Sequence, residues 1–203
     1  MKTALALAAV AVVQAAPAPT AREDAEAAMR AALVRAAQTY VNGNPEANRP
    51  CVRTEVVDVA FEPWRVAIRG QDERAKRDRS AQVSPSGERR VAEEFDWSAE
   101  GRRLPAVEAK ALARAMRVIH ERAEPLPKFV RAIDPAWLPA GLKACPPNAH
   151  WRVLTFSAPT VIGDIAFVET EHICPLCGNG GSLSLRRTPS GWAPWAFRLL
   201  WIS

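Results

Sequence analysis

Residues 161–203 read VIGDIAFVETEHICPLCGNGGSLSLRRTPSGWAPWAFRLLWIS, and this stretch decides how the chain folds. Apolar residues alternate or run together over 165–173, which predicts a strand. The proline and glycines of 174–181 predict a turn, because they interrupt regular structure. A second strand is expected over 182–187 and, after a short turn, a third over 192–202. The stretch therefore predicts an antiparallel meander at the C-terminus.

Two helices and several further strands are predicted before the meander. Thr20 and Glu23 have the spacing of a capping box, which predicts a helix from Thr20 to residue 41. Pro105 suits the first position of a second helix over 105–123. Further strands are expected at 51–60, 64–68, 91–97 and 151–156. This order of helix, strands, helix, strands predicts an α+β fold with two main helices packed on an antiparallel sheet.

Each predicted helix has one apolar stripe for packing. In the first helix the stripe consists of Ala25, Met29, Ala32, Leu33, Ala36 and Tyr40, and in the second of Leu112, Ala115, Met116 and Ile119. The charged segment 70–90 is expected to be a surface loop, and 126–133 is expected to contain one helical turn. Both stripes are interpreted as core positions rather than as sites.

The N-terminus has the layout of a secretory signal peptide. Lys2 precedes an apolar run over 4–13, and Ala15 and Ala16 supply small residues for cleavage. The other interpretation, an apolar helix of a cytosolic protein, fits this layout less well. The run is shorter than the roughly 20 residues of a membrane span. We expect a signal peptide over 1–16, a single domain over 17–203, no membrane span in the mature chain, and a periplasmic or secreted location.

The charge of the chain does not predict a nucleic-acid partner. The formal net charge is +5, and Lys2 is the only charged residue before Arg22, so the mature chain would carry 5 − 1 = +4. This surplus is modest for a whole domain, and acids are interleaved with the basic residues.

Four cysteines in an exported chain predict two disulfides, with three possible connectivities. Cys174 and Cys177 are close neighbours in the predicted turn, which favours their pairing and leaves Cys51 to pair with Cys145. That second bridge would span 145 − 51 = 94 residues, and in the chain-entropy model it contributes about 4.5 kcal/mol.

The segment Cys-Pro-Leu-Cys-Gly at 174–178 also allows two other interpretations. It could supply two thiolates to a zinc ion, with further ligands from Cys51, Cys145, His150 or His172. It could also be a redox-active dithiol, although no helix is predicted after it to lower a thiol pKa. Export favours oxidation of the cysteines, so neither a metal nor another cofactor is expected.

The other candidate groups do not form a recognised catalytic motif. His120, His150 and His172 lack the partners found in hydrolase and metalloprotease motifs. Glu169 and Glu171 lie on one face of a predicted strand, which we interpret as its solvent side. Trp192, Trp195 and Trp201 are expected in the core or in a partly exposed ligand groove. No catalytic residue is assigned.

The last fifty residues resemble a group of exported bacterial proteins for which no activity is established. The shared elements are the strand 167–173, the turn 174–180 with Gly-x-Gly, the strand 183–187, Gly191-Trp192 and the closing Leu200-Trp201-Ile202-Ser203. This chain has Pro175 directly after the first cysteine, where the group often has glycine and a further residue between the cysteines. The resemblance implies export and paired cysteines, and it implies no activity.

The sequence therefore predicts an exported, disulfide-stabilised protein of the cell envelope that binds a small ligand or another protein. A hydrolase that uses one of the histidines, or a thiol- or zinc-dependent protein that uses the Cys174–Cys177 turn, is the second hypothesis.

Overall fold

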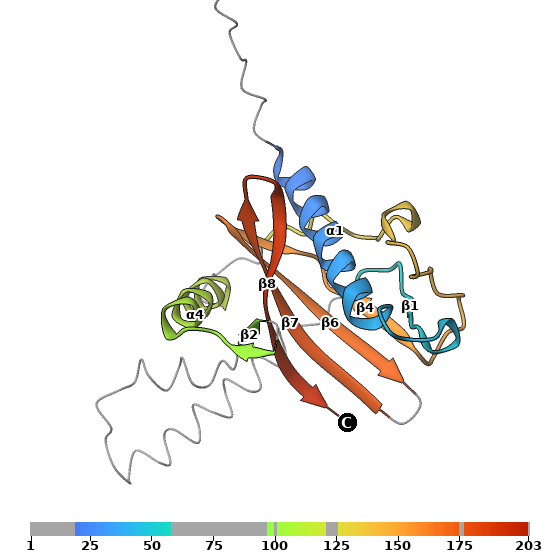
Figure 1. The fold of residues 1–203 in the computed structure, drawn as a ribbon. Helices are drawn as coiled ribbons and strands as arrows, with labels where there is room; N and C mark the ends of the chain where they lie inside the picture. The colour runs from blue at the N-terminus through green and yellow to red at the C-terminus, as the bar shows by residue number, and fades with distance from the viewer. Residues whose placement is uncertain (1–18, 58–96, 100, 121–125, 175–176, 203) are drawn as a thin grey trace, which may run out of the picture.

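The computed structural model describes residues 19–57, 97–99, 101–120, 126–174 and 177–202 (Figure 1). For residues 120, 177 and 200–202 the description is limited to the backbone. The elements in chain order are α1 (Ala21–Tyr40), η1 (Glu46–Asn48), β1 (Cys51–Val52), β2 (Ser98–Ala99), β3 (Arg102–Arg103), α4 (Ala106–His120), η2 (Pro135–Trp137), β4 (Val153–Phe156), β5 (Thr160–Ile162), β6 (Ile165–Cys174), β7 (Cys177–Thr188) and β8 (Gly191–Ile202).

One eight-stranded sheet organises the described part of the chain. Its strand order is β1-β4-β6-β7-β8-β2-β3, and β5 pairs with β6. Strands β1 and β4 are parallel, and the other pairs are antiparallel. The fold is α+β with the C-terminal meander β6-β7-β8, as predicted.

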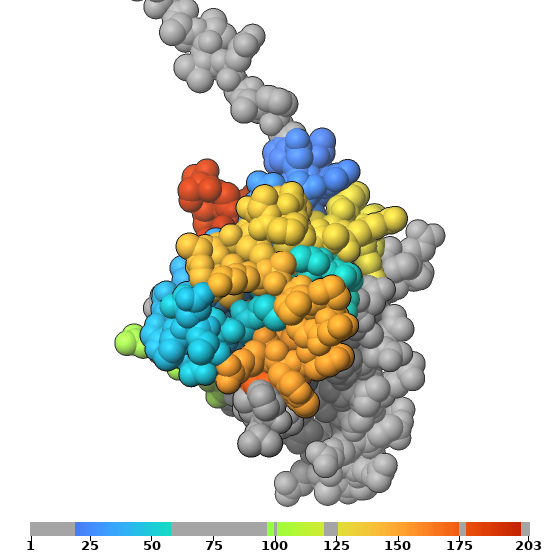
Figure 2. Space-filling view, turned by 90° about the vertical axis from the view of Figure 1, so that its right-hand side faces the viewer, coloured from blue at the N-terminus to red at the C-terminus, as the bar shows by residue number. Residues whose placement is uncertain are grey.

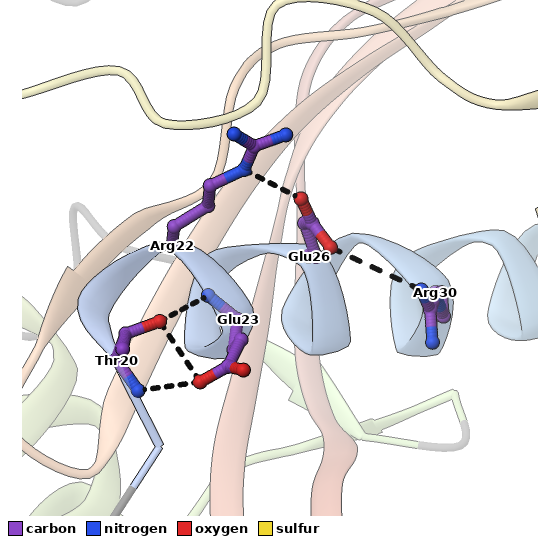
Figure 3. Close-up of polar contacts among 5 residues, drawn as sticks. All are labelled: Thr20, Arg22, Glu23, Glu26 and Arg30. Atoms are coloured by element: carbon purple, nitrogen blue, oxygen red, sulfur yellow. Dashed lines mark hydrogen bonds and ion pairs between the residues drawn. The ribbon is translucent and has the colours of Figure 1, made fainter.

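Helix α1 begins at the predicted capping box. The Thr20 hydroxyl accepts a hydrogen bond from the Glu23 backbone amide at 3.3 Å, and the Glu23 carboxylate accepts one from the Thr20 amide at 2.8 Å (Figure 3). These contacts satisfy backbone donors that the first helical turn leaves unpaired. Figure 3 also shows Arg22 and Arg30 on either side of Glu26, one helical turn away in each direction.

The two helices pack on opposite faces of the sheet. Ala166 and Val168 of β6 belong to the α1 cluster, whereas Phe167, between them, belongs to the α4 cluster. This follows from the two-residue period of a strand. The predicted core stripes are confirmed, because Met29 and Leu33 of α1 and Leu112 and Met116 of α4 are fully buried.

A partly buried ion pair attaches the start of α1 to the hairpin of β7 and β8. The Asp24 carboxylate accepts hydrogen bonds from the Arg187 guanidinium and, at 2.8 Å, from Trp192 Nε1. Arg187 also lies over the Trp192 ring and reaches Asp164 at 3.3 Å. Burial raises the pKa of Asp24, but the hydrogen bonds from Arg187 and Trp192 outweigh burial and hold the pKa below its usual value.

The predicted reversal between two antiparallel strands is confirmed, but the turn predicted over 174–181 is too long, because the glycines after Cys177 lie in a strand. Strand β6 extends to Cys174 and β7 begins at Cys177, so Gly180 and Gly181 are sheet residues. A Cβ atom on Gly181 would lie 2.1 Å from Phe197 Cζ and 2.5 Å from the Arg198 carbonyl oxygen. Glycine is needed there because the ring of β8 approaches closely, not because the backbone needs a positive φ.

Other boundaries also differ from the predictions. Within the described part of the strand expected over 51–60, only β1 is regular. Beyond Val52 the backbone forms a bridge between Glu55 and Ala132, and the Arg53 and Val57 amides donate to the Leu154 and Phe156 carbonyls of β4. The helical turn expected over 126–133 is instead η2, because the Asp134 carboxylate caps the Ala136 amide and Pro135 begins the turn. Strands β2, β3 and β5 were not predicted. The segments 58–60, 64–68, 70–90, 91–96 and 121–123 lie outside the described residues.

Candidate binding surface

A disulfide joins two loops at the β1 end of the sheet. Cys51 and Cys145 are bonded, with their Cα atoms 4.8 Å apart, as the sequence favoured. Three backbone hydrogen bonds of 2.8 Å support the same junction: Cys51 donates to Arg152, Val52 to Lys143, and Cys145 to Val52. Segments 42–53 and 143–152 thus form one fixed surface, which we call the stapled face. Figure 2 shows the first segment in light blue to cyan against the orange of the second.

Arg152 has an unusual backbone on this face. Its φ is 56°, and it is the one residue other than glycine with positive φ among those that the structure describes. Positive φ is unfavourable for a residue with a Cβ atom, so the surrounding contacts must hold it. The Arg152 guanidinium donates to the Ala47 carbonyl, and its own carbonyl accepts from Cys51.

Trp151, directly before Arg152, is exposed. Fifty-nine per cent of its surface is accessible, and its neighbours His150 and Arg152 are also exposed. Burial of an indole ring stabilises a protein by a few kcal/mol relative to exposure, so this tryptophan contributes little to the core. A rigid backbone therefore presents a large aromatic side chain to solvent.

The two segments of the stapled face also carry basic side chains. Arg49 donates to the Asn44 carbonyl at 3.0 Å and Arg53 to the Ala149 carbonyl at 3.4 Å. Lys143 forms an exposed ion pair with Glu46 at 2.6 Å. The hydrogen bond from Lys143, its charge and that of Arg49 lower the pKa of Glu46. With Arg152, the stapled face carries four basic residues and one acid.

A second group of polar side chains lies on the α4 face of the sheet, and its burial corrects the interpretation of Glu169 as a solvent-facing residue. Glu169 is 2% exposed, and Ser182 on β7 donates to its carboxylate at 2.7 Å. Glu171, two residues along β6, accepts from Thr155 at 3.5 Å. The sequence Val-Glu-Thr-Glu-His at 168–172 does not show whether the face that carries Glu169 and Glu171 is covered or exposed.

The structure does not bring a histidine and a carboxylate together within β6. His172 lies beside the Tyr40 ring, with the ring centres 4.8 Å apart, and burial lowers the pKa of His172. Glu171 is its neighbour in the strand, so its side chain points to the opposite face. His150 is exposed on the stapled face, and the side chain of His120 lies outside the described residues.

Cys174 is also disulfide-bonded. The sheet register places Cys177, the first residue of β7, directly opposite Cys174, the last residue of β6. Pairing between these two cysteines stays a prediction, since the side chain of Cys177 is not described. Within the described ranges, no three His, Cys, Asp or Glu side chains are arranged to hold a metal ion.

The tryptophans were expected in the core or in a partly exposed groove. Trp192 and Trp195 pack against the core on opposite faces of the sheet, so they form no shared groove. Trp192 packs with the α1 cluster, and Trp195 packs with the α4 cluster, where its Nε1 donates to Glu108 at 2.7 Å. An irregularity in the pairing of β7 with β8 places Trp195 beside Ala196 on the same side. The side chain of Trp201 lies outside the described residues.

Sequence reasoning missed Trp151 because it assigned this residue to the strand that begins at Val153. The available signal was the context: Pro146, Pro147 and Asn148 favour a loop, and polar residues flank the tryptophan on both sides.

No family model, curated protein or solved structure matches this chain. Among the described helices, none is both long enough and apolar enough to cross a bilayer.

Proposed function

We propose that this chain is an exported envelope protein, stabilised by disulfides, that binds a partner rather than catalysing a reaction, and that it binds through the stapled face. The observation that carries the proposal is Trp151, which is 59% exposed on loops that a disulfide and backbone hydrogen bonds hold in place. Exposed aromatic side chains on rigid loops are the usual anchors of binding surfaces, because little conformational entropy is lost on contact.

The disulfides support export. A bridge between residues 94 positions apart persists in oxidising compartments, whereas cytosolic thiols are kept reduced. N-terminal sequencing of the natural protein tests this part, and we expect the mature chain to begin near Ala16. An intact Met1 on protein recovered from the cytoplasm would contradict export.

Binding is tested by cosedimentation of the mature protein with the envelope fraction of the source cells. We expect Trp151→Ala to reduce the sedimented fraction at least fivefold. Phe129→Ala is the matched control, since Phe129 is a partly exposed aromatic residue (41%) outside the stapled face. Equal sedimentation of both variants and the wild type would contradict a role for this surface.

An envelope hydrolase is the second candidate, and the buried carboxylate of Glu169 with its Ser182 donor favours it. A buried carboxyl group can act as a general acid or base where a substrate reaches it. A panel of chromogenic esters and glycosides tests this candidate: turnover by the wild type that is lost in Glu169→Gln would support the hydrolase. A zinc- or thiol-dependent role fits less well, because a disulfide-bonded Cys174 has no thiolate.

A further inference from the structure

The surroundings of Trp151 indicate which class of ligand it contacts. The other large apolar residues exposed in the described part of the chain belong to other segments; they are Val34, Val107, Val118, Phe129 and Leu199. None of these residues adjoins Trp151 in the sequence. Trp151 instead has His150 and Arg152 beside it in the sequence. A flat ring in a polar setting suits a ligand with C–H groups on its face and hydroxyl groups at its edge, as in a sugar ring.

The charge of the stapled face adds a requirement for acidic groups. The side chains of Arg49, Arg53 and Arg152 donate hydrogen bonds to the backbone carbonyls of Asn44, Ala149 and Ala47. A carbonyl is a neutral acceptor, so these hydrogen bonds do not neutralise the guanidinium charges, although the Arg49 charge also acts on Glu46. Glu46 is the one acid of the two segments, and it forms an ion pair with Lys143. The surplus is 4 − 1 = +3 over the two segments of the stapled face.

From these two observations we infer that the stapled face binds an acidic polysaccharide, with a sugar ring stacked on Trp151 and sugar carboxylates paired with the arginines. Guanidinium groups match planar carboxylates because two parallel N–H donors meet two oxygen atoms. The inference rests on the proposed binding function and specifies its ligand class.

Isothermal titration calorimetry of the mature protein with galacturonate oligomers tests the inference. Two comparison ligands separate the contribution of ring stacking from that of carboxylate pairing. Fully methyl-esterified oligomers keep the sugar rings without the charges, and poly-glutamate keeps the charges without the rings. We expect the galacturonate oligomers to bind at least tenfold more tightly than either, and their affinity to fall as the salt concentration rises.

The variants identify the surface. Trp151→Ala should weaken binding of the galacturonate oligomers at least tenfold, Trp151→Phe should weaken it less, and Phe129→Ala should leave it within twofold. Lys143→Gln should weaken binding of the oligomers only about twofold to threefold, because an exposed ion pair between Lys143 and a sugar carboxylate contributes little binding free energy. Melting temperatures close to that of the wild type would show that each variant is folded.

The possible failures are distinguishable from failure of the proposed function. If poly-glutamate binds as tightly as the oligomers and Trp151→Ala weakens both, the partner is an acidic protein, and the polysaccharide is excluded. If none of the three ligands binds while Trp151→Ala still abolishes sedimentation with the envelope, the ligand class is wrong and the binding surface stands. If Trp151→Ala binds the oligomers as well as the wild type does, the inference is overturned.

Discussion

Two acidic residues connect elements of the fold. Glu169 connects β6 to β7, and Asp24 connects α1 to the hairpin of β7 and β8. Glu169 lies within β6 with almost no access to solvent, and a serine of the neighbouring strand donates to it. Asp24 joins the first turn of α1 to an arginine and a tryptophan of the last hairpin. The Glu169 carboxylate is removed from water and the Asp24 carboxylate is partly so, and each is stabilised by its donors.

Ser182→Ala should lower the free energy of unfolding by about 1–3 kcal/mol, because it removes a donor from a buried carboxylate. Urea denaturation of the two proteins measures this loss. Ser190→Ala, at an exposed turn, is the control and should change the stability by less than about 0.5 kcal/mol. A Ser182→Ala protein as stable as the control variant would show that the Ser182 hydrogen bond contributes nothing.

Asp24→Asn should destabilise the protein by about 1–2 kcal/mol at pH 7, because hydrogen bonds to a charged group are stronger than neutral ones. The folded-state pKa of Asp24 is lowered, so its contribution is complete above the unfolded-state pKa of about 3.9 and is lost as the pH falls through the folded-state pKa.

Thermal unfolding of wild type and Asp24→Asn between pH 7 and pH 2 checks this pH dependence. The gap between the two proteins should narrow toward low pH. Asp164→Asn is the matched control, because Asp164 contacts the same arginine but is 80% exposed. A gap that stays constant with pH would contradict the role of the Asp24 charge.

At the scale of elements, close approach between strands determines residue choice in the meander. Gly181 of β7 faces the Phe197 ring of β8, and the register between these strands shifts next to Gly181. The glycines that resemble a turn signal in the sequence therefore serve the packing of one strand against another.

Gly181→Ala should destabilise the protein by about 1–3 kcal/mol, because the added methyl group overlaps both a side chain and a carbonyl oxygen. Denaturant midpoints measure the cost. In a Phe197→Ala background the cost of Gly181→Ala should become smaller but not vanish, since the Arg198 carbonyl remains. An equal cost in both backgrounds would exclude the Phe197 ring as a cause.

Replacing Cys51 and Cys145 by serine should lower the free energy of unfolding by about 2–5 kcal/mol, whereas replacing Cys174 and Cys177 should cost less. The first bridge closes a long loop of the unfolded chain, and a bridge between Cys174 and Cys177 would close a very short one. Urea denaturation of both double variants gives the order. The prediction fails if the Cys174/Cys177 variant is the less stable of the two.

The elements differ in how far the sequence predicts them. Helix α1 was predictable to within a residue or two, because Thr20 and Glu23 mark its start and Met29 and Leu33 its buried stripe. Strand β7 was predicted too short, since glycine has the same local signature in a turn as beside the Phe197 ring. The covered position of Glu169 and the exposed position of Trp151 depend on tertiary contacts, which a single sequence does not contain.

In the molecule as a whole, helices cover the two faces of the sheet, whereas loops lie at its β1 end. Helix α1 packs on one face and α4 on the other, while the β1 end carries loops joined by a disulfide (Figures 1 and 2). Loops supported by a rigid scaffold are the usual location of binding residues. In the proposed complex, Trp151 therefore contacts the partner.

Hydroxyl-radical footprinting detects this contact in the wild-type protein, because mass spectrometry reads oxidation at each aromatic residue. In the free protein Trp151 should be oxidised rapidly, in keeping with its 59% exposure. On the envelope fraction its oxidation should fall at least threefold, while that of Phe129 stays unchanged. If Trp151 is oxidised equally fast in the free and the bound protein while other residues become protected, Trp151 does not contact the partner.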